Sequence, residues 1–135
     1  MNTDLLMDGL LLADADENLT TRFYEILFDR YPAVRPMFSS DVRPQAAMLR
    51  TAVLAVLEHL DDPEWLTTTL GGLGAKHAEY GATPAMFDAV GECMVAAMAE
   101  LGGAEWTPEM TAEWSAALRT VSDLMLAGYP QPVAV

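Results

Sequence analysis

Basic residues are scarce in this sequence of 135 residues: Lys and Arg number 7 against 20 Asp and Glu, which gives a formal net charge of −13. Nucleic-acid-binding modules rely on basic side chains that neutralise phosphates, so this charge excludes that class and also disfavours attraction to anionic lipid. The single cysteine, Cys93, permits no internal disulfide and no site built from several thiolates, which fits a reducing compartment. Disorder of the whole chain is excluded because 52% of the residues are hydrophobic.

Long apolar runs, strand patterns and a secretory signal are missing as well. No run approaches the length that crosses a membrane, and Asp4 and Asp8 lie where a secretory signal would be basic. No two alternating β-branched runs are joined by an Asn-Gly or Asp-Gly turn. We therefore expect an all-α, cytoplasmic protein without membrane contact, and the length fits a single domain over residues 1–135.

Apolar residues recur at helical spacing through most of the chain. Three of these stripes are Met48, Leu49, Ala52, Val53, Val56, Leu57 and Leu60, then Phe87, Val90, Met94, Met98 and Leu101, then Met110, Trp114, Ala117, Val121 and Leu124. In Thr83-Pro84 and Thr107-Pro108, a capping residue precedes a proline suited to the first helical turn. The pattern predicts helices over residues 3–17, 19–31, 33–38, 44–60, 64–79, 84–101 and 107–127, followed by a short mobile tail at 128–135.

The two histidines differ in their surroundings. His59 lies near a predicted helix end between acidic neighbours, which is typical of a surface residue. His77 shares an apolar helix face with Leu66, Leu70, Leu73 and Tyr80. Taken alone, His77 can be a hydrogen-bonded core residue or an axial ligand to haem iron, for which one imidazole on an apolar wall suffices. Zinc would require three or four ligands, which the chain does not offer around it.

Other kinds of chemistry have little support in the sequence. Without strands there is no strand-linked phosphate loop, so the glycines before His77 are interpreted as loosening the helix or packing it tightly: Gly71, Gly72 and Gly74. No serine nucleophile elbow occurs, and the acidic run Asp14, Asp16 and Glu17 is typical of a solvated surface rather than of a calcium loop.

Four segments occur in an order that is more specific than any one of them. They are Phe23-Tyr24-Glu25-Ile26-Leu27-Phe28 through Tyr31-Pro32-Ala33-Val34-Arg35-Pro36-Met37-Phe38, then Leu73-Gly74-Ala75-Lys76-His77-Ala78-Glu79-Tyr80-Gly81, then Val90-Gly91-Glu92, then Trp106-Thr107-Pro108-Glu109 with Trp114. Over about residues 19–127 the chain resembles the bacterial single-domain globins related to flavohaemoglobin. The resemblance implies a globin-like, three-over-three helical sandwich that binds haem b.

The resemblance also implies roles for individual residues. His77 would be the proximal ligand to haem iron, and Phe38 would pack on the porphyrin. Tyr24 and Gln45 would be the distal residues that hydrogen-bond to bound ligand. The remaining contacts to the cofactor would come from Leu49 on the distal wall, from Phe87, Val90 and Met94 on the proximal side, and from Lys76 near a propionate.

Two positions depart from the flavohaemoglobin-like pattern. Such globins have a tyrosine ten residues after the proximal histidine and a glutamate late in the last helix, where this chain has Phe87 and Tyr129. The hydrogen bonds that would raise the basicity of the imidazole are therefore expected to be missing, which argues against peroxidase-like activation.

The expected function is reversible binding of dioxygen, and also of nitric oxide, with nitric oxide dioxygenation as an activity if a separate reductase restores ferrous haem. One alternative is a haemless, globin-like sensor or interaction domain in which His77 is only a core residue. Another alternative is a haem enzyme acting on a small organic substrate.

Overall fold

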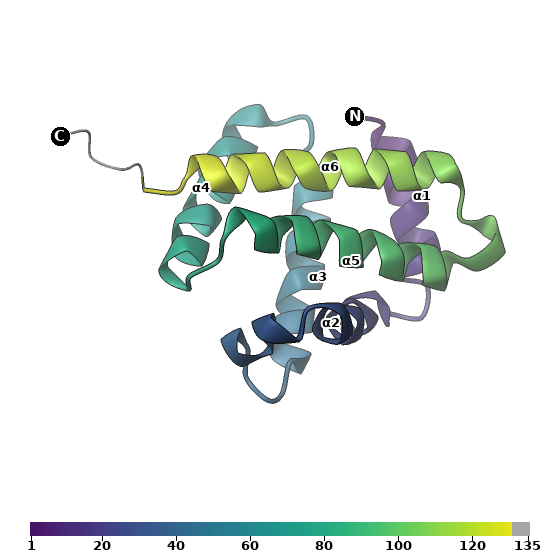
Figure 1. Cartoon of the computed structure of the whole chain (residues 1–135). Coiled ribbons are helices and arrows are strands. Elements are labelled where there is room, and N and C mark those ends of the chain that lie inside the picture. Colours follow the sequence, from purple (N-terminus) through teal and green to yellow (C-terminus); the bar gives the residue numbers. More distant parts are fainter. Residues whose placement is uncertain (131–135) are drawn as a thin grey trace.

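The computed structural model describes residues 1–130, and within this range it contains helices and no strand (Figure 1). The elements are α1 (Thr3–Ala13), α2 (Leu19–Arg30), η1 (Pro32–Met37), α3 (Arg43–Glu58), α4 (Pro63–Glu79), α5 (Pro84–Gly102), η2 (Gly103–Glu105) and α6 (Pro108–Ala127), where η denotes a 3₁₀-helix. The predicted all-α fold is confirmed. None of the helices in residues 1–130 combines the length and the apolar character that a membrane span requires.

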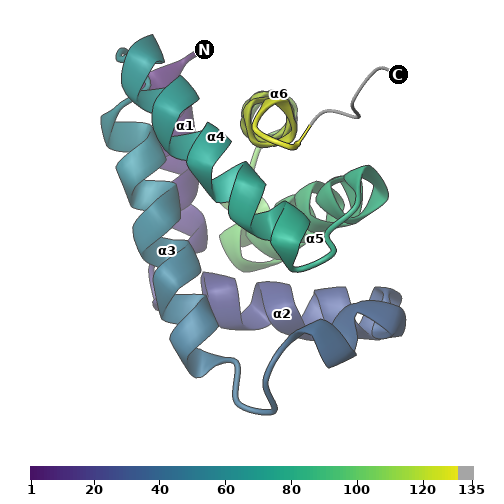
Figure 2. The ribbon, with the colours of Figure 1, turned by 90° about the vertical axis from the view of Figure 1, so that its left-hand side faces the viewer.

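The helices form two layers, with α1, α3 and α4 on one side and α2, α5 and α6 on the other (Figure 2). The main contacts between layers join α4 to α6, α1 to α5, and α2 to α3, while α5 packs on both α2 and α6 within its own layer. Helices α3 and α4 share few contacts and diverge from the turn that joins them (Figure 2). The packing therefore presents α3 and α4 to different neighbours.

The helix starts follow the predicted punctuation. Proline stands at the first or second position of α3, α4, α5 and α6, where its missing N–H costs no hydrogen bond. Asp62 caps α4 by accepting from the backbone N–H of Trp65 at 3.1 Å, and Thr107 caps α6 in the same way. Thr83 also precedes a proline but makes no such bond.

The first helix is shorter than predicted, ending at Ala13 instead of residue 17. The side chain of Asp14 accepts from the backbone N–H of Leu19 at 3.2 Å and from Arg50 Nε at 2.8 Å, so it holds a turn rather than extending the helix. Glu17 adopts a φ of 59°, a left-handed conformation that interrupts any right-handed helix.

Three further expectations were wrong in detail. Met48 is 69% exposed, because it and Leu49 point about 100° apart on α3 and only Leu49 faces the core. Tyr80 is 68% exposed, because α4 ends at the preceding residue and the apolar face ends with it. The helix predicted over residues 33–38 is instead a 3₁₀-helix over Pro32–Met37, in which Pro36 cannot donate the bond that an α-helix would need.

The predicted tail lies mostly outside the described residues. The mobile tail was predicted over residues 128–135, of which 131–135 lie outside the described residues. Tyr129, at the start of that segment, packs on the fold, and its hydroxyl donates to the carbonyl oxygen of Ala82 at 2.8 Å.

Among residues 1–130 the core consists of two separate hydrophobic clusters. The first cluster is large and is built mainly from α1, α2 and α5, with Phe23, Leu6 and Met98 among its fully buried side chains. The second cluster contains the buried residues Leu70, Phe87 and Met125, which come from α4, α5 and α6. The part of the molecule that carries His77 is therefore held by a much smaller core than the rest.

A close approach of backbones joins α4 to α6. A Cβ added at Gly74 would overlap the carbonyl group of Met125 and lie 2.8 Å from its Cα. A Cβ added at Gly128 would overlap Gly71 in the same manner, whereas Gly72 has open space around it. Of the two roles left open for these glycines, close packing applies to Gly71 and Gly74.

Candidate functional site

Tyr24 lies in α2 at the centre of an aromatic group. Its ring is 5.5 Å from that of Phe38 and 5.8 Å from that of Phe28, and those two rings are 5.4 Å apart. The side chain is buried, and burial raises the pKa of the Tyr24 phenol, so the hydroxyl stays protonated at neutral pH. Within residues 1–130 this hydroxyl has no hydrogen-bond partner, which leaves its proton available to a ligand.

Gln45 lies in the first turn of α3, after the loop that follows Phe38. Its Oε1 atom is the one buried side-chain polar atom in the described part of the chain that lacks a hydrogen-bond partner. Leaving such a group unpaired costs about 1–3 kcal/mol, so it marks a place where a polar partner is expected. Leu49, one turn later, is half-buried against the first cluster.

His77 lies near the end of α4 with one ring nitrogen engaged. Its Nδ1 is 2.7 Å from the carbonyl oxygen of Leu73, which assigns the proton to Nδ1 and leaves the Nε2 lone pair free to bind a metal. The ring is half-buried and lies 6.0 Å from that of Phe87.

The other histidine makes a similar hydrogen bond but lies in a different environment. His59 Nδ1 is 2.7 Å from the carbonyl oxygen of Ala55, and its ring is stacked on Trp65 at 3.8 Å. The hydrogen bond to the carbonyl four residues earlier therefore does not distinguish the two histidines. The neighbouring residues do, because only His77 lies against the aromatic ring of α5.

The proximal candidates on α5 lie at different depths. Phe87 is buried between His77 and Tyr129, with ring separations of 6.0 and 6.1 Å. Met94 is fully buried, and Val90 is half-buried against the first cluster. Lys76 is exposed and forms no ion pair with any described residue.

No carboxylate supports the His77 imidazole in residues 1–130. Its hydrogen-bond acceptor is the neutral carbonyl of Leu73, and the Tyr129 hydroxyl donates to Ala82. A neutral acceptor orients the ring without the increase in basicity that a carboxylate would give.

The structure brings the predicted residues together in two groups. Tyr24 and Phe38 are in contact, and Leu49, Val90 and Met94 belong to or pack on the same cluster. His77 contacts Phe87, which belongs to the second cluster. The donor set suits haem, because one imidazole with a free nitrogen and several half-buried apolar side chains are what the porphyrin requires.

One cavity among the described residues lies away from these side chains. About 380 Å³ in volume, it is lined by Leu10, Leu11, Asp14, Ala15, Asp16, Glu17, Arg50 and Leu54. None of the predicted site residues lines it. On its polar wall, Arg50 binds both Asp14 and Glu17, while Asp16 has no partner among the described residues.

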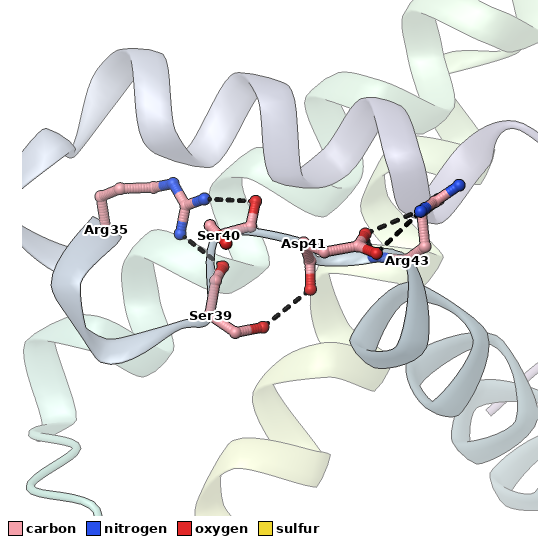
Figure 3. Close-up of polar contacts among 5 residues, drawn as sticks. All are labelled: Arg35, Ser39, Ser40, Asp41 and Arg43. Atoms are coloured by element: carbon pink, nitrogen blue, oxygen red, sulfur yellow. Dashed lines mark hydrogen bonds and ion pairs between the residues drawn. The ribbon is translucent and has the colours of Figure 1, made fainter.

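The sequence analysis assigned no role to Arg35, which lies seven residues after Phe28 and three before Phe38. In Figure 3 its guanidinium reaches the backbone of the loop after Phe38. The available signal was its place between two prolines, three residues before Phe38, where a long side chain on a 3₁₀-turn can reach the next loop.

Comparisons with known proteins agree on one family. A family model described as Globin matches residues 21–125. A flavohemoprotein of Burkholderia sp. (strain TH2) is 34% identical over 122 residues, covering 86% of this chain and 30% of that protein. The chain therefore spans about 30% of the length of this relative.

Two solved structures share the fold over nearly the whole chain. One is a Pseudomonas aeruginosa protein described as highly homologous in structure to human hemoglobin, with a TM-score of 0.84, 20% identity, and coverage of 96% of this chain and 98% of the other. The second is an engineered carbene transferase of Rhodothermus marinus, provisionally described as a nitric oxide dioxygenase, with a TM-score of 0.77, 23% identity, and coverage of 93% and 88%. At these identities the likeness supports the three-over-three helical sandwich.

Proposed function

The chain belongs to the globin family, and on that premise we propose that it holds haem b and reversibly binds dioxygen, and also nitric oxide. Membership of this family implies a haem cofactor. When bound, haem supplies an iron atom that takes a diatomic ligand and can change its oxidation state.

The proposed cofactor contacts come from both clusters. His77 would bind the iron through Nε2, since Nδ1 is engaged by Leu73. Apolar contact with the porphyrin would come from Phe38, Leu49, Phe87, Val90 and Met94. Lys76, exposed and without an ion pair among the described residues, would offer its charge to a propionate.

On the other side, Tyr24 and Gln45 would hold the ligand. The Tyr24 hydroxyl would donate a hydrogen bond, because burial keeps it protonated. The Gln45 amide carries both donors and an acceptor, so it could orient a ligand or the Tyr24 hydroxyl. A hydrogen bond to a charged or strongly polarised ligand contributes about 1.5–3 kcal/mol, or roughly one to two decades in affinity.

The unpaired, buried end of the Gln45 amide is the observation that carries this proposal, because a 180° turn of the amide would place an N–H donor there for a diatomic ligand, which accepts hydrogen bonds. Among the described residues it is the one fully enclosed side-chain polar atom without a partner, whereas the Tyr24 hydroxyl, which also has none, is not fully enclosed. The resemblance assigns Gln45 to the ligand site. A residue that served only to fill the core would be expected to be apolar or fully hydrogen-bonded at that depth.

The second candidate function is nitric oxide dioxygenation. Nitric oxide and dioxygen would combine to nitrate with one electron from a separate reductase. This candidate is favoured by the relation to flavohemoproteins and by the provisional description of the Rhodothermus marinus protein. The neutral acceptor on His77 favours reversible binding as the main activity, because peroxidase-like activation depends on a more basic imidazole.

Absorption spectra of the purified chain, expressed with supplied haem, test the proposal. A Soret band that shifts on reduction and again on exposure to oxygen is expected. His77→Ala should abolish haem binding. The same change at the other histidine, His59→Ala, should retain it, because His59 is half-buried against Trp65 instead of lying against Phe87. A folded helical protein without a Soret band would overturn the proposal in favour of a haemless interaction domain.

The ligand site is tested by rates. Tyr24→Phe should accelerate oxygen dissociation by about 10–100-fold, the loss expected for one charge-assisted hydrogen bond. Tyr31→Phe is the matched control, since the Tyr31 hydroxyl bonds to Glu92 instead of lying among the aromatic rings. An unchanged rate in Tyr24→Phe would exclude Tyr24 from the ligand site.

A further inference from the structure

Arg35 holds the loop that follows the 3₁₀-helix η1. Its Nη1 donates to the carbonyl oxygen of Ser39 at 2.9 Å, with a longer contact of 3.4 Å to that of Phe38. Its Nη2 donates to the carbonyl oxygen of Ser40 at 3.0 Å (Figure 3). One planar guanidinium thus binds three consecutive carbonyls, which fixes the direction of the chain as it leaves Phe38.

The same guanidinium also holds an aromatic ring. Its central carbon lies 4.6 Å from the centroid of the Phe28 ring, within the range of a cation–π interaction. Arg35 therefore connects the Phe28 ring to the backbone at Phe38. Both rings contact Tyr24, which also packs on Phe23 of its own helix at a ring separation of 4.9 Å.

Arg35 differs from the other arginines in its partners. Each of the others forms an ion pair with at least one carboxylate: Arg22, Arg30, Arg43, Arg50 and Arg119. Arg35 forms no ion pair with any residue from 1 to 130, although the chain is rich in acidic groups. The Arg35 guanidinium instead binds backbone carbonyls and packs on an aromatic ring, so its role is to fix the positions of these groups.

The loop continues this arrangement into α3. The Ser39 hydroxyl donates to the carbonyl oxygen of Asp41 at 2.7 Å, and Arg43 binds the Asp41 carboxylate at 2.8 and 2.9 Å (Figure 3). Arg43 is the first residue of α3, and Gln45 follows two positions later. The bonds that begin at Arg35 therefore also set where the first turn of α3 lies.

We propose that Arg35 is a positioning residue for the ligand site: by binding three consecutive loop carbonyls and the Phe28 ring, it fixes Phe38 and the start of α3 so that Tyr24 and Gln45 are held ready for a ligand. This inference rests on the proposed function, since it assigns Arg35 a role through Tyr24 and Gln45. Arg35 itself does not touch the ligand.

A double-mutant comparison tests the connection to Tyr24. In the haem-loaded protein, Arg35→Met should accelerate oxygen dissociation by about tenfold, because a displaced Phe38 no longer holds the phenol in place. In the Tyr24→Phe background the same substitution should change the rate clearly less, since the Tyr24 hydrogen bond is already gone and only the contribution of Gln45 is left to lose. An equal acceleration in both backgrounds would overturn the proposal, because the effect would not pass through Tyr24.

Two further variants separate geometry from charge. Arg119→Met removes one positive charge from an exposed site on α6 and should leave the rate unchanged. Arg35→Lys keeps the charge but replaces the planar fork with a single ammonium, so it should not restore the wild-type rate. Full restoration by lysine would show that charge alone matters and would overturn the proposal.

Amide hydrogen exchange in the haem-free protein provides a readout that is independent of ligand binding. The amides of Phe38, Arg43 and Ala46 are hydrogen-bonded in and just after the loop, and Arg35→Met should raise their exchange rates about tenfold relative to those of α6. Unchanged exchange would overturn the clamp itself. If the wild-type chain takes up no haem, the proposed function fails, whereas this measurement still decides whether Arg35 holds the loop.

Discussion

Gly74 and Gly72 lie two residues apart in α4, yet alanine should have opposite effects at the two positions. At Gly74 the added methyl group would overlap the carbonyl of Met125 and approach its Cα to 2.8 Å. Both partners are backbone atoms of packed helices, so no side chain can rotate away. We expect α4 to move from α6 by ~1 Å or more, which would loosen the second cluster around Leu70 and Phe87.

The magnitude follows from two opposing contributions. Overpacking typically costs about 1–3 kcal/mol, and a clash of backbone with backbone belongs at the upper end of that range. Alanine returns about 1 kcal/mol through its higher helix propensity. The expected net loss for Gly74→Ala is therefore about 2 kcal/mol, while Gly72→Ala, with open space around it, should gain about 1 kcal/mol.

Urea unfolding followed by far-ultraviolet circular dichroism measures both free energies. The two variants should differ by about 3 kcal/mol in free energy of unfolding, although the substitution is chemically identical. Since His77 is only three residues beyond Gly74, the Gly74→Ala variant should also bind haem less tightly. Equal stabilities of the two variants would refute the argument from close packing of α4 on α6.

Three other predictions concern the loop, the helix caps and the attachment of α1. The Asp41 carboxyl should titrate with a pKa of about 2 instead of 3.8, mainly because the Arg43 side chain binds it. Its contribution to stability is complete above pH 3.8 and is lost as pH falls toward 2. Arg43→Gln should return the pKa of Asp41, measured by NMR, to its usual range. Asp62→Ala should cost about 1 kcal/mol in urea unfolding through the lost cap of α4, whereas Thr83→Ala, at a position without a capping bond, should cost much less. Trp114→Phe removes the buried hydrogen bond that its indole donates to the backbone of α1, which should cost about 1–3 kcal/mol and accelerate amide exchange in α1.

The helical fold could be predicted from the sequence because two local signals agree. Apolar stripes gave the existence of the helices, and prolines gave their starts, since both depend on residues close in sequence. The end of α1 was missed because it depends on Asp14 bonding to Arg50, 36 residues away in sequence. Periodicity likewise could not assign Met48 to the exterior, because that requires knowing which side of α3 faces the core.

In the candidate site, too, the features that depend on sequence motifs could be predicted, and those that depend on contacts between distant segments could not. The roles expected of Tyr24, Phe38 and His77 follow from a register of motifs, and the contact between the Tyr24 and Phe38 rings is compatible with that register. The role of Arg35 could not be predicted from the sequence, because its acceptors are backbone carbonyls, which every residue has. For Gly74 the sequence allowed either a loosened helix or close packing. The close packing could not be predicted because it depends on where α6 passes.

The division of the core into two clusters has a consequence for how long the protein survives in the cell. In residues 1–130, the cluster that holds α4 has three buried side chains, those of Leu70, Phe87 and Met125, with partly buried ones around them, so this helix should open more readily than those in the larger cluster. A cofactor that binds only the closed form suppresses such opening by mass action, and proteases act on the open form. We therefore expect chains without cofactor to be degraded first, so that the cellular amount of this globin follows the supply of haem without any change in its synthesis.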